Sequence, residues 1–211
     1  MKKSGYKGEE FLNTTTKPLL LILSGPSGTG KDSVLTKMRE LDLPLEFIVT
    51  VTTRPQRAKE KDNIDYHFIS RACFQEMLQA KELLEWANVY GNWYGVPKKP
   101  VKQALDSGKD VVVKVDIQGV ITIKKILDQA VSIFLIPPSI QELTSRLKQR
   151  NTESKTDLDL RLQTAEQEIK KLPIFDYAVV NKQEQIDSAV SDIIAIITAE
   201  KLRTMPRKYN L

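Results

Sequence analysis

The feature that most constrains this chain is a glycine-rich loop that ends in a lysine. A short apolar run at residues 19–23 precedes the loop, and Val34, Leu35, Met38 and Leu41 recur at helical spacing after it. The loop has the pattern G-x-x-x-x-G-K and reads Gly25, Pro26, Ser27, Gly28, Thr29, Gly30, Lys31. Strand, loop and helix in this order are the setting in which such a loop binds phosphate, because its N–H groups and the helix N-terminus attract anions. The sequence therefore predicts a nucleotide-binding loop.

The rest of the chain continues the alternation of strands and helices. Apolar runs at residues 111–115, 131–136 and 177–180 predict buried strands. Apolar positions at helical spacing predict three further helices, which would contain residues 140–147, 158–169 and 186–197. The first of these opens with the capping-box pattern Ser139-Ile-Gln-Glu142. The pattern predicts an α/β fold with a parallel sheet flanked by helices. Residues 46–98 interrupt the rhythm and read as an inserted subdomain.

Histidine and cysteine each occur once, which excludes several kinds of chemistry. Cys73 has no partner for an internal disulfide, so a reducing compartment is favoured. A single His67 excludes a site with two histidine ligands and leaves little room for a zinc centre. We expect His67 to be structural or at the surface and Cys73 to be a small buried group.

The net charge of +5 comes from the two ends of the chain. Residues 1–17 and 200–211 carry the surplus of lysine and arginine, whereas residues 18–199 hold 24 charges of each sign. Solvated tails explain this pattern better than a nucleic-acid or membrane surface. The longest aliphatic stretches are far shorter than the roughly 18 residues that span a membrane, so a cytoplasmic protein is expected.

Further motifs lie in the interrupted stretch and beyond it. They are Thr50-Val-Thr-Thr-Arg54-Pro-Gln-Arg57, Asp65-Tyr66, Glu85-Trp86-Ala87, Gly91-Asn-Trp-Tyr94-Gly95, Asp116-Ile-Gln-Gly119 and the arginines 146, 150 and 161. Together with the phosphate loop, this set resembles guanylate kinase over roughly residues 18–198. The resemblance implies transfer of the terminal phosphoryl group of ATP to GMP (and to dGMP) with Mg²⁺, on a P-loop core with a GMP-binding insertion and a helical lid.

The resemblance also divides the chain. It implies a flexible extension at 1–17, core segments at 18–48 and 101–137, the GMP-binding insertion at 49–100 and a lid region at 138–170. Residues 171–211 would hold a core strand, the C-terminal helix and a basic tail.

On the acceptor side, the resemblance assigns Arg54, Arg57, Tyr66 and Tyr94 to the GMP phosphate. Guanidinium groups bind phosphate in a bidentate manner and phenols add neutral donors. Glu85 aligns with the residue that reads guanine, because a carboxylate accepts from both the ring N1–H and the exocyclic amine. Thr50 would turn its hydroxyl toward the base, and Asp116 belongs to the same site.

On the donor side, the resemblance assigns residues 25–31 to ATP, followed by Asp32 and Ser33, with Asn181 near the adenine. Lys31, Arg146, Arg150 and Arg161 would act on the transferring phosphates, the three arginines arriving with the lid. Phosphoryl transfer depends on positioning and charge stabilisation, so cations suffice for it.

Three residues depart from the family pattern. Asp32 stands where a magnesium-binding Ser or Thr is expected, and Lys114 stands where an Asp is frequent. We predict that the two changes compensate: Asp32 takes a magnesium ligand's place and Lys114 pairs with it. Val96 replaces a Ser or Thr that helps to bind guanine, which predicts one missing hydrogen bond.

Three other functions fit parts of the pattern. A non-catalytic interaction module of the same fold would be expected to lack the phosphate loop. A nucleic-acid-associated protein would use the basic ends, and a kinase for another nucleoside monophosphate would not need Glu85.

Overall fold

Two β-sheets organise the described part of the chain, which in this computed structural model comprises residues 17–58, 60–89, 91–149, 155–209 and 211. The larger sheet is parallel throughout and has the order β2-β7-β1-β8-β9. Its strands are β1 (Leu20–Ser24), β2 (Leu45–Phe47), β7 (Asp110–Lys114), β8 (Val131–Ile136) and β9 (Tyr177–Val180). The parallel sheet predicted from the apolar runs is confirmed, while the short and half-buried β2 was not predicted.

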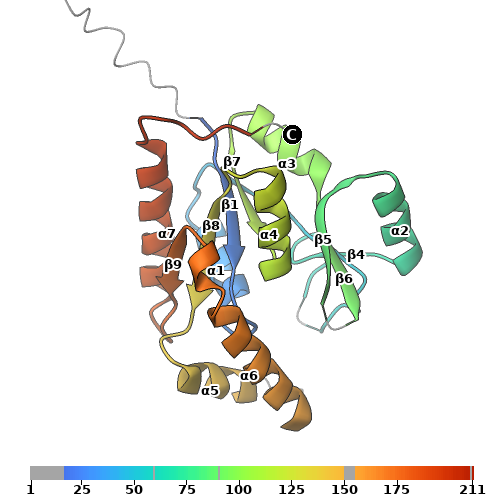
Figure 1. The fold of residues 1–211 in the computed structure, drawn as a ribbon, viewed down its shortest axis with the longest axis vertical. Helices are drawn as coiled ribbons and strands as arrows, with labels where there is room; N and C mark the ends of the chain where they lie inside the picture. The colour runs from blue at the N-terminus through green and yellow to red at the C-terminus, as the bar shows by residue number, and fades with distance from the viewer. Residues whose placement is uncertain (1–16, 59, 90, 150–154, 210) are drawn as a thin grey trace, which may run out of the picture.

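Helices cover both faces of the larger sheet. On one face, α1 (Lys31–Arg39) and α7 (Ile186–Lys201) share a core with Leu21 and Leu23, and on the other, α3 (Lys98–Asp106) and α4 (Ile117–Ile126) share a core with Leu20 and Ile22. Successive side chains of a strand point to opposite faces, so an uninterrupted apolar run suits a sheet covered on both sides. Figure 1 shows this three-layered arrangement with α7 and α4 on opposite sides of β1.

The smaller sheet is inserted between β2 and β7 and lies beyond α4 (Figure 1). Its order is β4-β3-β6-β5, and it is made of β3 (Val51–Thr52), β4 (His67–Phe68), β5 (Leu83–Val89) and β6 (Asn92–Pro97). Helix α2 (Arg71–Gln79) packs on it through the fully buried Phe74. Cys73 is only partly buried, which corrects the expectation that it lies in the core.

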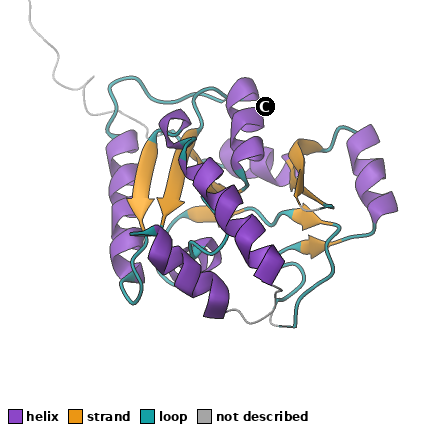
Figure 2. Cartoon of the chain, turned by 60° about the horizontal axis from the view of Figure 1, so that its bottom comes forward, coloured by secondary structure: helices purple, strands orange, loops and turns teal. Residues whose placement is uncertain are grey.

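Helices α5 (Ile140–Gln149) and α6 (Lys155–Ile169) follow β8, and a 3₁₀ turn at Leu172–Ile174 leads into β9. The Glu142 N–H donates to the Ser139 hydroxyl, so the predicted cap of α5 is confirmed. Figure 2 brings α5 and α6 forward, at the end of the molecule toward which the core strands run. No helix in the described ranges is long and apolar enough to cross a membrane.

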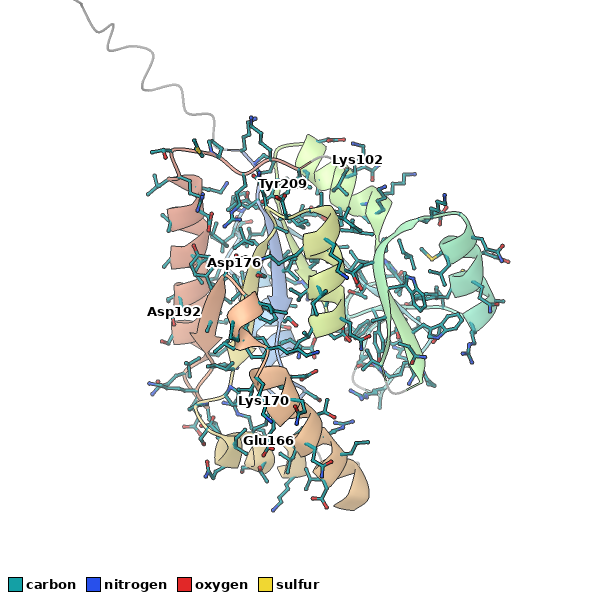
Figure 3. The ribbon with its side chains drawn as sticks, in the orientation of Figure 1. Lys102, Glu166, Lys170, Asp176, Asp192 and Tyr209 are labelled. Carbon is teal, nitrogen blue, oxygen red and sulfur yellow. The ribbon has the colours of Figure 1, made fainter. Side chains whose placement is uncertain are left out.

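The basic C-terminal segment is docked on the core, which corrects the expectation of a solvated tail at this end. Glu200 is 3% exposed, and its carboxylate accepts from Nε and NH2 of Arg207, each at 2.7 Å, and from the Tyr177 hydroxyl. The Tyr209 side chain packs against the core cluster of α3 and α4, and the Lys102 ammonium donates to the Leu211 carbonyl. Figure 3 labels Tyr209 and Lys102 at the end of the molecule opposite α6. The extension predicted at 1–17 lies, apart from its last residue, outside the described residues.

Candidate active site

An open cleft lies between the phosphate loop, the smaller sheet and α6. Its empty volume is about 1190 Å³, the open mouth included. It is lined by Gly25, Ser27, Gly28, Gly30, Lys31, Asp32, Thr50, Arg54, Arg57, Tyr66, Glu85, Ala87, Val89, Tyr94, Lys114, Val115, Asp116, Arg161, Thr164 and Glu168. Residues from five helices and strands (α1, β5, β6, β7 and α6) and from the loops between elements therefore meet at the carboxyl ends of the core strands, which is where open α/β sheets bind ligands.

The phosphate loop joins β1 to α1 in a conformation that requires glycine. Gly30 stands immediately before α1 with φ of 87°, and a Cβ at Gly25, with φ of 145°, would lie 2.2 Å from the Leu135 carbonyl oxygen. The Lys31 ammonium donates to the carbonyls of Gly25 at 2.5 Å and Pro26 at 3.0 Å. The Lys31 ammonium is therefore bonded to carbonyl groups of its own loop, next to the positive N-terminal end of α1.

Two residues predicted on the donor side, Asn181 and Arg146, hold the phosphate loop through hydrogen bonds. The Asn181 amide donates to the Thr29 carbonyl at 2.8 Å, and Arg146 donates to the carbonyls of Thr29 at 3.3 Å and Asn181 at 2.7 Å. Arg146 also pairs with Glu142 one turn earlier on α5. Within the described chain, the buried Oδ1 of Asn181 has no hydrogen-bond partner.

The acceptor side is built from side chains that hold one another. The Arg54 Nε donates to the Tyr94 hydroxyl at 3.1 Å, and its NH2 pairs with the Glu60 carboxylate at 2.7 Å. The guanidinium carbon also lies 5.5 Å from the centre of the Tyr66 ring. Burial tends to lower the pKa of Arg54, but Glu60 and Tyr94 outweigh it and raise that pKa, so the guanidinium remains charged.

Glu85 is a buried carboxyl group at the far end of the acceptor side. It is 4% exposed, and among the described residues its Oε2 finds no hydrogen-bond partner. Burial, with a smaller contribution from the charge of Asp116, raises the pKa of Glu85 to about 8. Gly119 makes the space for this group, because a Cβ there would lie 2.9 Å from Oε2. Asp116 caps α4 by accepting from the Gly119 N–H at 2.8 Å.

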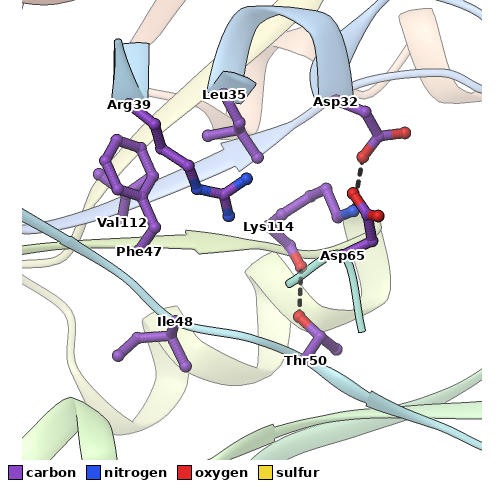
Figure 4. Close-up of a pocket in the computed structure, with 9 residues that line it drawn as sticks. All are labelled: Asp32, Leu35, Arg39, Phe47, Ile48, Thr50, Asp65, Val112 and Lys114. Carbon is purple, nitrogen blue, oxygen red and sulfur yellow. Dashed lines mark hydrogen bonds and ion pairs between the residues drawn. The ribbon is translucent and has the colours of Figure 1, made fainter. Parts of the chain in front are cut away.

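Asp32 and Lys114 form the ion pair predicted from their departures. The Lys114 Nζ lies 2.6 Å from Oδ1 of Asp32 (Figure 4), so the pairing is confirmed. The Asp32 side chain is 66% exposed and lines the cleft beside Lys31. Mg²⁺ in kinases is commonly held by one or two carboxylates together with substrate phosphates. Asp32 is an exposed carboxylate that lines the cleft, so its donor chemistry fits a ligand of this kind. Among the described residues, no group of three or more His, Cys, Asp or Glu could hold a metal ion.

Comparison with known proteins decides the family. The sequence matches the guanylate kinase family model over residues 17–200. The chain belongs to the guanylate kinase family. It is 41% identical to a guanylate kinase of Carboxydothermus hydrogenoformans, over 92% of this chain and 93% of that one. It is also 41% identical to a chloroplastic and mitochondrial guanylate kinase 2 of rice (Oryza sativa subsp. japonica), over 96% of this chain and 71% of that one.

A solved structure agrees with the family assignment. The crystal structure of guanylate kinase from Anaplasma phagocytophilum superposes with a TM-score of 0.75 at 33% identity, and it covers 90% of this chain and 89% of that chain. The expected P-loop fold with a parallel sheet flanked by helices is therefore that of a guanylate kinase.

Most residues assigned from the family resemblance meet in the cleft, but not all. Pro26, Thr29, Ser33, Asn181 and Arg146 do not line it, and Ser33 is exposed on α1. Arg150 lies outside the described residues. Arg161 lines the cleft from α6. The arginines of the lid region are therefore not equivalent here, since Arg146 is tied to the phosphate loop.

The guanylate kinase cleft also contains side chains that sequence reasoning missed. Thr164 and Glu168 line it from α6 with Arg161, and their spacing of three and four residues, which places them on one helix face, could have revealed them. Burial raises the pKa of Glu168. Glu60 gave no signal, because it lies in a loop without periodicity.

Proposed function

We propose that this member of the guanylate kinase family transfers the terminal phosphoryl group of ATP to GMP, giving ADP and GDP, in the cleft between the phosphate loop and the smaller sheet. The observation that carries this proposal is the Glu85 carboxyl group, which is buried, lines the cleft and has no hydrogen-bond partner for Oε2 in the part of the chain that the structure describes. A buried polar group without a partner is costly, so a ligand that donates to it gains affinity. Guanine offers N1–H and an amine together, whereas adenine offers no donor at N1.

The acceptor side would hold GMP by both ends. Arg54, Arg57, Tyr66 and Tyr94 supply the charge and hydroxyl donors for the phosphate, while Glu85 accepts from the base. Thr50 and Asp116 line the same cleft, on the core side of the acceptor. Arg54 is already oriented by Tyr94 and Glu60, so little side-chain freedom is lost when phosphate binds.

The donor side would hold ATP through the loop amides and Lys31, with Asn181 and Arg146 supporting the loop from behind. Arg161 on α6 would approach the phosphates from the lid region, and Arg150 would join it as the family pattern implies. Together these cations stabilise charge on the transferring group and exclude water from it. When bound, Mg²⁺ would neutralise charge on the phosphates, with Asp32 as its protein ligand. The single cysteine and the reducing compartment that it favours fit a cytoplasmic enzyme.

A coupled assay of ADP release tests the proposal with ATP and Mg²⁺ against GMP, dGMP, IMP, AMP, CMP and UMP. IMP keeps the N1–H of guanine and lacks its amine, so it isolates one of the two bonds to Glu85. We expect GMP and dGMP to be the best acceptors, IMP to be weaker and AMP to be inactive. Turnover of AMP equal to that of GMP would point to a different monophosphate, and no turnover with any acceptor would point to a non-catalytic module.

A further inference from the structure

The Lys114 ammonium lies at the junction between the two halves of the cleft. Lys114 is the last residue of β7 and pairs in register with Leu23 of β1, one residue before β1 ends and the phosphate loop follows. The Thr50 hydroxyl donates to the Lys114 carbonyl at 3.4 Å, which ties this strand end to the start of the inserted sheet. The backbone of Lys114 is therefore held in place by contacts with both the phosphate-loop half and the smaller-sheet half of the cleft.

Its side chain contacts a group from each phosphate subsite. The Nζ lies 2.6 Å from Asp32, which follows the phosphate-loop lysine, and 4.1 Å from the ring centre of Tyr66 on the acceptor side. Figure 4 shows Lys114 between Asp32 and Thr50. A cation at this point lies where a phosphoryl group passing from donor to acceptor would be closest to both subsites.

The surroundings keep this group charged and in place. The Lys114 side chain is 13% exposed. Burial tends to lower its pKa, but the Tyr66 phenol and the Asp32 carboxylate outweigh burial and hold the pKa of Lys114 above its ordinary value. The ammonium is held by the Tyr66 hydroxyl and by the exposed carboxylate of Asp32. It can exchange the exposed carboxylate for phosphate oxygens, which carry more negative charge.

We propose that Lys114 is a catalytic residue of this chain, whose ammonium leaves Asp32 and contacts the phosphoryl group during transfer. The inference rests on the proposed function. It also explains why a positive charge is tolerated at a position where the family frequently has a carboxylate: the cation supplies the charge that stabilises the transferring group. Lys114 would act together with Lys31 and Arg161, which line the same cleft.

The alternative is that Lys114 only neutralises Asp32, and a pair of variants separates the two roles. We expect Lys114→Met to lower kcat by about a hundredfold, as for loss of one transition-state contact, while the KM values for ATP and GMP change by less than about threefold. Lys114→Arg, which keeps the charge, should recover part of the loss. In Lys114→Met/Asp32→Asn, kcat should stay low, whereas recovery to the level of Asp32→Asn alone would overturn the proposal.

A binding measurement without Mg²⁺ gives a readout independent of turnover. The probe is a dinucleotide in which five phosphates join adenosine to guanosine, so that its chain crosses both subsites, and its affinity is measured by calorimetry. We expect Lys114→Met to weaken this probe by about tenfold or more, as for a lost charge-assisted contact, and to leave GMP alone within about threefold. Equal affinity of wild type and variant for the probe would overturn the proposal.

A matched control and the wild type complete the design. Lys109→Met removes a similar ion pair, with Glu46 at 3.0 Å, just before the same strand and away from the cleft, and it should change neither readout. Thermal unfolding of each variant shows whether it is folded. If the wild type fails to phosphorylate GMP, the proposed function fails; if the wild type is active and Lys114→Met is equally active, only the role of Lys114 fails.

Discussion

The two halves of the cleft prepare for phosphate by different means. On the donor side, the loop of residues 25–31 is fixed by backbone: Gly25 and Gly30 take positive φ, and Lys31 bonds to loop carbonyls. On the acceptor side, the contacts come from side chains of separate elements. Arg54 and Tyr94 hold each other there, and Glu60 holds the guanidinium.

This difference suits the donor side to binding phosphate in general and the acceptor side to selecting one nucleotide. A cradle of backbone amides recognises phosphate and is indifferent to the base, whereas a set of converging side chains can be matched to one acceptor. We therefore expect donor-side substitutions to act mainly on kcat and acceptor-side substitutions mainly on the KM for GMP.

The largest effect is expected for Lys31→Met on the donor side. If, as we propose, the Lys31 ammonium contacts the transferring phosphates, its removal should lower kcat by about a thousandfold, because a fixed charge at the transferring group is lost. Steady-state kinetics with ATP varied at saturating GMP measures the loss, and circular dichroism checks the fold.

Lys37→Met serves as the control for Lys31→Met on the same helix. Lys37 is partly exposed and pairs with Glu40 at 3.2 Å, away from the cleft, so its loss should leave kcat unchanged. A near-normal kcat for Lys31→Met would show that phosphoryl transfer does not depend on this lysine.

The next effect is expected for Arg54→Met on the acceptor side. A charge-assisted hydrogen bond contributes about 1.5–3 kcal/mol, so the KM for GMP should rise by about ten- to a hundredfold while the KM for ATP stays the same. Arg71→Met is the matched control, because Arg71 stacks on Trp93 at 4.4 Å and does not line the cleft. If Arg54→Met changed only kcat, the expectation that acceptor-side substitutions act mainly on the KM for GMP would be wrong.

The donor side of the cleft could be predicted from the sequence more completely than the acceptor side. The donor loop is a local feature of seven consecutive residues between a strand and a helix, so its position could be predicted almost completely. The acceptor residues were assigned through the family pattern, because Arg54, Tyr66 and Glu85 are far apart in sequence and meet only through the smaller sheet. The contact between Asp32 and Lys114 could be predicted since β1 and β7 are neighbours and the two charges are opposite.

Other features depend on tertiary contacts that leave no local signal. The C-terminal segment resembles a solvated basic tail, yet Arg207 is part of the fold because it bonds to the buried Glu200 and to the Gln129 carbonyl. Arg146 resembles a mobile cation on an amphipathic helix, yet the packing of α5 against the phosphate loop gives it two backbone carbonyls as partners. In both cases the partner lies more than five residues away and is fixed by packing.

A smaller effect is expected from the protonation of Glu85. Because burial raises its pKa to about 8, the free enzyme holds this carboxyl group mostly neutral at pH 7, and binding of guanine through the carboxylate releases a proton. The affinity for GMP should therefore rise roughly tenfold between pH 7 and pH 8.5 and then level off, a range in which the GMP phosphate, with a second pKa near 6, is already a dianion. Calorimetry in two buffers of different ionisation heat should detect the released proton at pH 7.

Glu85→Gln is the control for this titration. It keeps the shape of the side chain and removes its ionisation, so GMP binding should be weaker and independent of pH. The sign for stability is opposite to that for binding: a raised pKa favours the folded state below the ordinary value of Glu, and this contribution is lost as the pH rises toward 8. If GMP binding by the wild type took up a proton, the assignment of Glu85 as an acceptor would be wrong.

The smallest effect, and the finest test of selection on the acceptor side, is expected for Val96→Thr. Val96 is fully buried and lies opposite Glu85 in the pairing of β5 with β6, so a hydroxyl at this position would lie beside the carboxyl group that we propose reads guanine. One added hydrogen bond contributes about 0.5–1.5 kcal/mol, so the affinity for GMP should rise by about two- to tenfold. The hydroxyl loses hydration in the free enzyme, so the melting temperature should fall at the same time. Val111→Thr is an equally buried change in the same core, but Val111 lies on β7 and not opposite Glu85, so it should lower the melting temperature without improving GMP binding. Equal GMP affinities in both variants would show that Val96 has no part in reading the base.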